Sequence, residues 1–134
     1  MAFTQACFIR KISNELCDKL TKLGYKDCWT GGIHSEELKT ITYVGNQCWC
    51  LTGFEPRNSI DCGTNEELFL ALASLRDDSD YMQWFVNKNG YFEMCFNDKV
   101  ENYLCGYGVR KYRQIDETYH KATVEEIIGH FKDK

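Results

Sequence analysis

Apolar residues are most continuous between positions 59 and 75, where the pattern predicts a short strand, a glycine turn and a helix. Leu68, Leu72 and Leu75 recur at helical spacing, and further apolar residues lie on both flanks of this stripe. A helix that is apolar on nearly every side belongs in a protein core. Thr64 and Glu67 have the spacing of a capping box, in which each side chain binds a backbone N–H at the helix start. We therefore expect a buried central helix that Thr64 caps.

Two further helices are predicted, one near each end of the chain. Ser13 is a favourable N-cap residue, helically spaced leucines follow it, and Gly24 stands where a glycine often ends a helix. Near the other end, Thr123 and Glu126 form a second capping box ahead of an apolar helix face. Both segments are therefore expected to pack as amphipathic helices.

Elsewhere the hydrophobic pattern breaks into short segments that are typical of strands. Two pairs of segments are joined by turn sequences, Gly45-Asn46 in the first and residues 87–90 in the second, and each pair predicts an antiparallel hairpin. Besides the strand before the central helix, the predicted strands cover residues 6–10, 25–30, 40–44, 47–52, 81–86, 91–96 and 103–112.

The order of these elements predicts the fold class. Helices that alternate with hairpins, rather than with single strands, indicate one α+β domain over residues 1–134, with a mainly antiparallel sheet and three helices. Residues 6–52 and 58–97 share a βαββ order, and residues 103–134 add a strand and a helix. Capping sequences alone can produce such matches, so an internal duplication and a chance likeness both stay open.

Charge and composition narrow the range of functions. The 134 residues carry a net charge of −4, too little acid for a DNA mimic and the wrong sign for a general nucleic-acid binder. The first residues lack the basic and apolar regions of a signal peptide, and no apolar run approaches the length of a membrane span. These features predict a cytoplasmic protein that does not act at a membrane.

Eight cysteines are the most unusual polar feature of the sequence. In a chain without a signal peptide they are expected to be reduced and mostly buried. Cys48 and Cys50 flank Trp49 in a predicted strand, so the two thiols share one face and Trp49 takes the other. With a third cysteine they could bind zinc, but no Cys-x-x-Cys pair is present. We expect neither a metal nor another cofactor.

Known catalytic motifs are absent from the sequence. It contains no Gly-x-Ser-x-Gly elbow, no phosphate-binding glycine loop and no His-Glu-x-x-His helix. A cysteine and a histidine can still meet in the folded chain, so a small cysteine- or carboxylate-dependent enzyme remains an alternative. No catalytic residue is assigned, and a binding function is favoured.

Aromatic residues make up 14% of the chain, and some of them are candidates for a binding surface. If Cys48 and Cys50 point inward, Trp49 points outward, and either Trp84 or its neighbour leaves the core, because successive side chains of a strand alternate. The only local basic cluster is interleaved with tyrosines, so it could grip a phosphate while an aromatic ring stacks on a base. The alternatives are core aromatics and a charged edge strand. The candidate binding residues are Trp49, Trp84, Tyr107, Arg110, Tyr112 and Arg113.

The run Cys-Gly-Thr-Asn-Glu-Glu-Leu that opens residues 62–86 resembles a segment of small proteins of unknown function from gut Bacteroides and their phages. Residues 8–11 and 120–127 are similar to the start and end of those proteins. The resemblance covers most of the chain, although the residues that carry it look structural. It implies a bacterial or phage setting in the cytoplasm and assigns no catalytic residue.

Together these patterns predict a non-enzymatic phage or mobile-element accessory protein. It would act by binding a host protein or a small nucleotide-like signalling ligand, with a possible role against host defence. A structural or assembly protein is a further alternative, and a homo-oligomer is compatible with the sequence.

Overall fold

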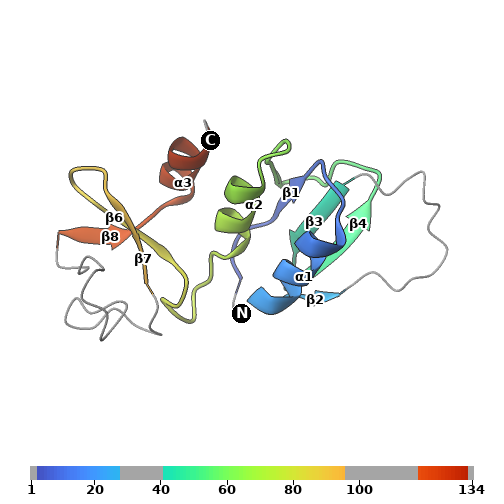
Figure 1. Cartoon of the computed structure of the whole chain (residues 1–134), viewed down its shortest axis with the longest axis horizontal. Helices are drawn as coiled ribbons and strands as arrows, with labels where there is room; N and C mark the ends of the chain where they lie inside the picture. Colours follow the sequence, from blue (N-terminus) through green and yellow to red (C-terminus); the bar gives the residue numbers. More distant parts are fainter. Residues whose placement is uncertain (1–2, 28–40, 96–117, 133–134) are drawn as a thin grey trace.

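The structure of the protein is a computed structural model that describes residues 3–27, 41–95 and 118–132. The order of elements is shown in Figure 1. The helices are α1 (Asn14–Leu23), α2 (Glu66–Ala73) and α3 (Val124–Phe131). The strands are β1 (Cys7–Ile9), β2 (Lys26–Asp27), β3 (Ile41–Gly45), β4 (Cys48–Thr52), β5 (Ile60–Asp61), β6 (Trp84–Asn87), β7 (Phe92–Met94) and β8 (Tyr119–Lys121).

The strands form two sheets. The larger has five strands in the order β2-β4-β3-β1-β5, and the smaller has three in the order β7-β6-β8. Most neighbouring strands are antiparallel, whereas β5 runs parallel to β1 and β2 runs parallel to β4. The α+β class, with mainly antiparallel pairing and three helices within the described residues, is therefore confirmed.

The central helix α2 lies between the two sheets (Figure 1). On one side it packs against β1 of the larger sheet, and on the other side it packs against α3. Ile9 and Val44 from the larger sheet, Leu72 from α2, Val86 from the smaller sheet and Ile127 from α3 all belong to one buried cluster. A single core thus joins both sheets through α2, and the prediction that this helix is buried is confirmed.

The caps predicted for α1 and α3 are present. The Ser13 hydroxyl accepts a hydrogen bond from the backbone N–H of Leu16 at 3.1 Å, and Gly24 ends α1 with a φ of 120°, which favours glycine. Thr123 and Glu126 form the reciprocal capping box, with bonds of 3.2 and 2.9 Å. The start and end of α1 and the start of α3 are therefore set by local sequence signals.

The capping box predicted for α2 is wrong. The N-cap is Asn65, whose carboxamide oxygen accepts a hydrogen bond from the Leu68 N–H at 3.0 Å. Gly63 adopts a φ of 60°, and its N–H donates to the Asp61 carboxylate at 2.8 Å. This turn carries the chain one residue further before the helix begins, so Thr64 lies outside the helix.

Both predicted hairpins are present with small shifts. Asn46 and Gln47 have φ values of 51° and 68°, so the β3–β4 turn is centred one residue later than Gly45-Asn46. Two consecutive positive φ values are the signature of a type I′ turn, which matches strand twist. In the second hairpin the Asn87 carboxamide accepts hydrogen bonds from two backbone N–H groups of the turn. The predicted strand over residues 103–112 lies outside the described residues, and the sequence patterns missed β8.

Leu72 provides the first test of this core. Its side chain is fully buried in α2, so Leu72→Ala should lower the free energy of unfolding by ~2–5 kcal/mol through lost burial and a residual cavity. Ile12→Ala is the matched control, because Ile12 is 41% exposed and its truncation should cost less than about 0.5 kcal/mol. Urea denaturation of both variants measures the difference, and equal midpoints would contradict the central position of α2.

The corrected cap gives a second prediction. Asn65→Ala should lower the free energy of unfolding by ~0.5–2 kcal/mol, because the α2 N-terminus loses its cap. The Asn65 amide also donates to the Phe131 carbonyl at 2.7 Å, which places the loss toward the upper end. Thr64→Ala, at the neighbouring exposed position, should change it by less than about 0.5 kcal/mol. Thermal or urea unfolding distinguishes the two, and a larger loss at Thr64 would restore the original assignment.

Candidate functional site

The outward orientation predicted for Trp49 is wrong. Trp49 is only 7% exposed, and its indole N–H donates to the Thr21 hydroxyl on α1 at 3.2 Å. It lies directly opposite Val44 in the β3–β4 ladder, and opposed residues of an antiparallel pair share one face of the sheet. Because Val44 is fully buried, that face belongs to the core, and Cys48 and Cys50 lie half-buried on the other face.

The cysteines of the described residues differ in state. Cys48 is disulfide-bonded, so the expectation of reduced thiols fails at this position. Cys7, Cys17, Cys50 and Cys62 are thiols, and burial raises the pKa of Cys7 well above its usual range. A thiol that stays protonated is a poor nucleophile. Among residues 3–27, 41–95 and 118–132, no group of three or more His, Cys, Asp and Glu side chains is placed to hold a metal ion.

Trp84 takes an intermediate position. Its neighbour Phe85 is buried on the opposite face of β6, whereas Trp84 is half-buried and packs edge to face against Phe131 of α3, with ring centroids 5.5 Å apart. It also meets Phe92 of β7 at a centroid distance of 6.4 Å. The strand therefore separates the two rings as alternation predicts, and part of the Trp84 ring remains accessible.

The other predicted binding residues are not tested by the structure. Tyr107, Arg110, Tyr112 and Arg113 all lie outside the described residues. Their role in binding stays a prediction. Of the two tryptophans proposed to lie beside the Arg110–Arg113 segment, Trp49 is buried and Trp84 is half-buried.

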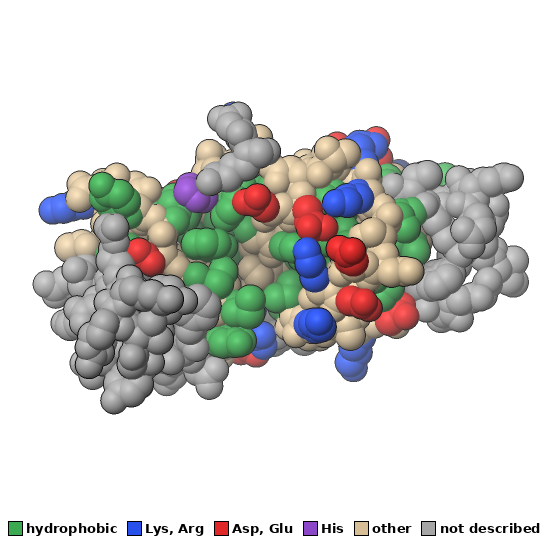
Figure 2. All heavy atoms as spheres, viewed as in Figure 1, with side chains coloured by type: hydrophobic (Ala, Val, Ile, Leu, Met, Phe, Trp, Pro, Cys, Tyr) green, Lys and Arg blue, Asp and Glu red, His purple; other side chains and the backbone are tan. Residues whose placement is uncertain are grey.

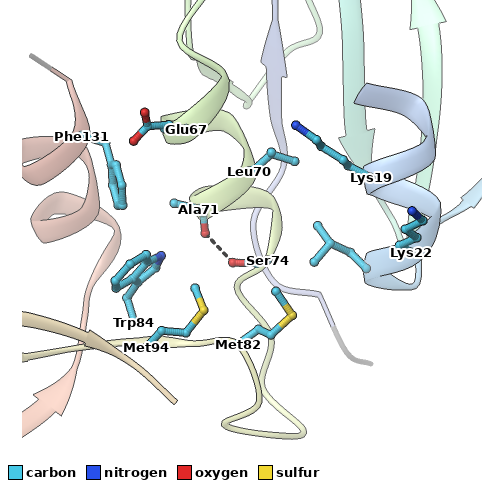
Figure 3. A pocket seen from close by; sticks show the side chains of 11 residues that line it. Lys19, Lys22, Glu67, Leu70, Ala71, Ser74, Met82, Trp84, Met94 and Phe131 are labelled. Atoms are coloured by element: carbon cyan, nitrogen blue, oxygen red, sulfur yellow. Dashed lines mark hydrogen bonds between the residues drawn. The ribbon is translucent and has the colours of Figure 1, made fainter. Parts of the chain in front are cut away.

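Trp84 lines an apolar groove of about 430 Å³ between α1, α2, α3 and the β6–β7 hairpin. Figure 2 shows hydrophobic side chains gathered in the middle of this face, beside a cluster of lysines and carboxylates. In Figure 3, Trp84, Met82 and Met94 point toward α2, while Lys19 and Lys22 stand on α1 at the opposite edge. The described residues that line the groove are Lys19, Lys22, Leu23, Glu67, Leu70, Ala71, Ser74, Met82, Trp84, Met94 and Phe131.

The helix α2 supplies the back wall of the groove because it is apolar on nearly every side. Leu68 and Leu72 are buried in the core, whereas Leu70 on another flank is only half-buried. Leu23 of α1 and Phe131 of α3 border this flank without closing it. Because α2 is apolar on nearly every side and lies between the two sheets, its flank at Leu70 stays partly open to solvent.

The segment before β6 holds the floor of the groove in place. Met82 has a φ of 59°, a left-handed conformation that non-glycine residues rarely adopt, and its N–H donates to the Cys95 carbonyl at 2.7 Å. The adjacent Gln83 is fully buried, accepts from the Arg76 N–H at 3.1 Å and donates to the Ser74 carbonyl at 2.6 Å. These bonds tie the segment to the end of α2 and hold Met82 toward the groove.

Charged residues stand only at the rim of the groove lining that the structure describes. Lys19 is paired with Glu66 at 3.1 Å, and this hydrogen bond lowers the pKa of Glu66. Lys22 and Glu67 are both exposed, and neither has an ion-pair partner within the described part of the chain. The groove therefore has an apolar interior with two lysines and one carboxylate at its edges.

A second hollow, of about 500 Å³, lies between the β6–β7 turn and α3. His120 contacts both carboxylate oxygens of Glu126, at 2.9 and 2.8 Å, and His130 stacks on Phe92 with centroids 4.0 Å apart. Glu126 is also engaged in the α3 capping box. The carboxylate oxygens of Glu126 are therefore already bound by His120 and by the start of α3. The apolar groove is for this reason the stronger candidate for a binding site.

Comparisons with known proteins give no assignment at this point: no protein-family model matches the sequence, and searches of curated proteins and of solved structures find no match. The resemblance to Bacteroides and phage proteins therefore stays a prediction. None of the helices in the described ranges is both long and apolar enough to cross a membrane.

Of the two predicted binding residues that the structure describes, Trp84 lines the groove and Trp49 does not. The sequence patterns do not indicate Met82, Met94 and Leu70 as site residues, since the three come from different segments and carry no motif. One feature of the sequence does indicate an exposed apolar surface: α2 is apolar on more faces than a single packing partner can cover.

The conformation of Met82 gives a third prediction. Met82→Val should lower the free energy of unfolding by ~1–3 kcal/mol, because a β-branched residue is strained at positive φ. Met82→Asn should stay within about 0.5 kcal/mol of the parent, since asparagine tolerates the left-handed region. Chemical denaturation measures both variants. Equal losses would show that the side chain, rather than the backbone conformation, matters at this position.

Proposed function

We propose that this protein acts by binding rather than by catalysis, and that the apolar groove receives the apolar part of its ligand or partner. The observation that carries this proposal is the set of half-buried apolar side chains, Leu70, Met82, Trp84 and Met94, that remain around a hollow of about 430 Å³. Hollows of ~300–1,000 Å³ that are mostly apolar and carry a few polar groups are typical ligand sites.

The chemistry of the lining favours binding over the enzymatic alternative. The described lining contains one carboxylate, Glu67, which is exposed, and it contains no histidine or cysteine. General acid–base or nucleophilic catalysis needs such groups within hydrogen-bond reach of the reacting atoms. Methionine, in contrast, adapts its shape to an apolar guest, and Met82 and Met94 are both in the lining.

Two kinds of partner were predicted, a host protein and a small nucleotide-like ligand. Trp84 could stack on a base, but the described lining offers few hydrogen-bonding groups to read one. The apolar character of the groove supports a guest with a substantial apolar part. A role as a phage or mobile-element accessory protein belongs to the same proposal and rests on the sequence resemblance.

The methionines provide a direct test. The chain has three, Met1, Met82 and Met94, and two of them line the groove. In protein labelled with ¹³C at the methionine methyl groups, decan-1-ol should shift the signals of Met82 and Met94. Met82→Leu and Met94→Leu assign the signals.

A pair of variants serves as the control for this test. Leu70→Glu places a charge in the groove and should weaken decan-1-ol binding at least about tenfold, because a buried charge is costly. Phe54→Glu changes a residue that is 72% exposed and absent from the groove lining, so it should leave binding unchanged. If decan-1-ol shifts neither groove methionine, the groove is not a binding site for apolar groups.

A further inference from the structure

The groove differs in charge between its ends. Lys19 and Lys22 stand on α1 at one end, and Glu67 stands on the first turn of α2, on the side of Phe131, at the other (Figure 3). Between them the described lining is apolar apart from Ser74, whose hydroxyl donates to the Ala71 carbonyl at 2.8 Å. The two ends of the groove therefore differ in charge, and this difference favours one orientation of a bound molecule over the other.

The two lysines are not equivalent. Lys19 is held by Glu66 at 3.1 Å, and Lys11 approaches the same carboxyl group at 3.5 Å. Lys22 is exposed and has no carboxylate partner within the described residues. Its methylene stem can lie along the groove while its ammonium group stays at the mouth. Lys22 is thus the cation that is available to an incoming anion.

The opposite end disfavours an anion. Glu67 is exposed and likewise has no ion-pair partner in the described part of the chain, so a second negative charge there would be repelled. Trp84 and Phe131, which pack edge to face near that end, present apolar surface instead. An apolar tail suits the Phe131 end, and an anionic head suits the α1 end.

We infer that the groove binds an anionic amphiphile, a molecule with one unbranched apolar chain and one anionic head, with the head at Lys22 and the chain running over Met82 and Leu70 toward Trp84. This inference rests on the proposed function, because it requires the groove to hold an apolar guest. The described lining carries two lysines and one carboxylate, which favours an anionic amphiphile over a neutral or cationic one. A protein segment and a second copy of the chain are the other occupants that the test distinguishes.

Decanoate and decylammonium make a matched pair of probes, since they carry the same length of apolar chain and opposite charges. Decanoate should bind at least about threefold more tightly, measured by the Met82 and Met94 methyl shifts at low salt. The net charge of −4 attracts the cation to the protein as a whole, so a preference for decanoate must come from the local lysine end. Added salt should reduce the preference.

Chain length and a single lysine complete the test. Decanoate should bind about 16-fold more tightly than octanoate, because each of its two additional methylenes contributes roughly fourfold when buried. Lys22→Gln should weaken decanoate binding about two- to fivefold, as expected for an exposed ion pair, and leave decan-1-ol binding unchanged. Lys88→Gln, at an exposed lysine of the β6–β7 turn outside the groove, is the control and should change neither.

The possible outcomes separate this inference from the proposed function. If decanoate, decan-1-ol and decylammonium bind equally, or if Lys22→Gln has no effect, the anionic head is overturned while the groove remains a binding site. If none of the probes shifts Met82 or Met94, both proposals fail. If the methionine signals shift with protein concentration alone, a second copy of the chain occupies the groove, and the amphiphile is overturned.

Discussion

The packing of α2 between β1 and α3 is the interaction on which the two sheets depend. Phe69 and Leu72 of α2 are fully buried. Hydrogen bonds also join the helix to a residue just after α1 on one side and to α3 on the other. The Tyr25 hydroxyl, which follows α1, donates to the Ala73 carbonyl at 2.6 Å, and the Asn65 amide donates to the Phe131 carbonyl of α3 at 2.7 Å. Because one short helix supplies the core for both units, its apolar residues must spread around the whole helix rather than form one stripe.

This arrangement also explains why the groove exists. Two units packed against opposite sides of a helix about 10 Å wide cannot close over every flank of it. Leu70 therefore stays half-buried between Leu23 and Phe131. The Gln83 side chain, which satisfies the Arg76 N–H and the Ser74 carbonyl, holds the segment below the groove so that Met82 and Trp84 face the open flank. The same contacts that join the sheets thus shape the candidate site.

Local signals predicted much of the fold, whereas the site depended on contacts that no local pattern encodes. Ser13, Gly24 and the Thr123 capping box act within a few residues, so the ends of α1 and α3 could be predicted. At α2, the Gly63 turn shifted the cap to Asn65, a choice between two good N-cap residues. The face taken by Trp49 depended on where α1 packs, and the groove required four elements to meet. Neither could be read from alternation alone.

The contrast between Trp49 and Trp84 shows what makes an aromatic residue available for binding. Both lie in strands of antiparallel hairpins, but α1 covers Trp49 and its indole N–H is bound to Thr21. Trp84 meets α3 edge to face at Phe131 and tilted at His130, and it remains half-buried. Two residues before it, Met82 holds a left-handed backbone conformation that costs stability. Residues that break local preferences tend to gather at functional sites. An incompletely covered tryptophan beside such a residue therefore supports the proposal that the groove binds an apolar group.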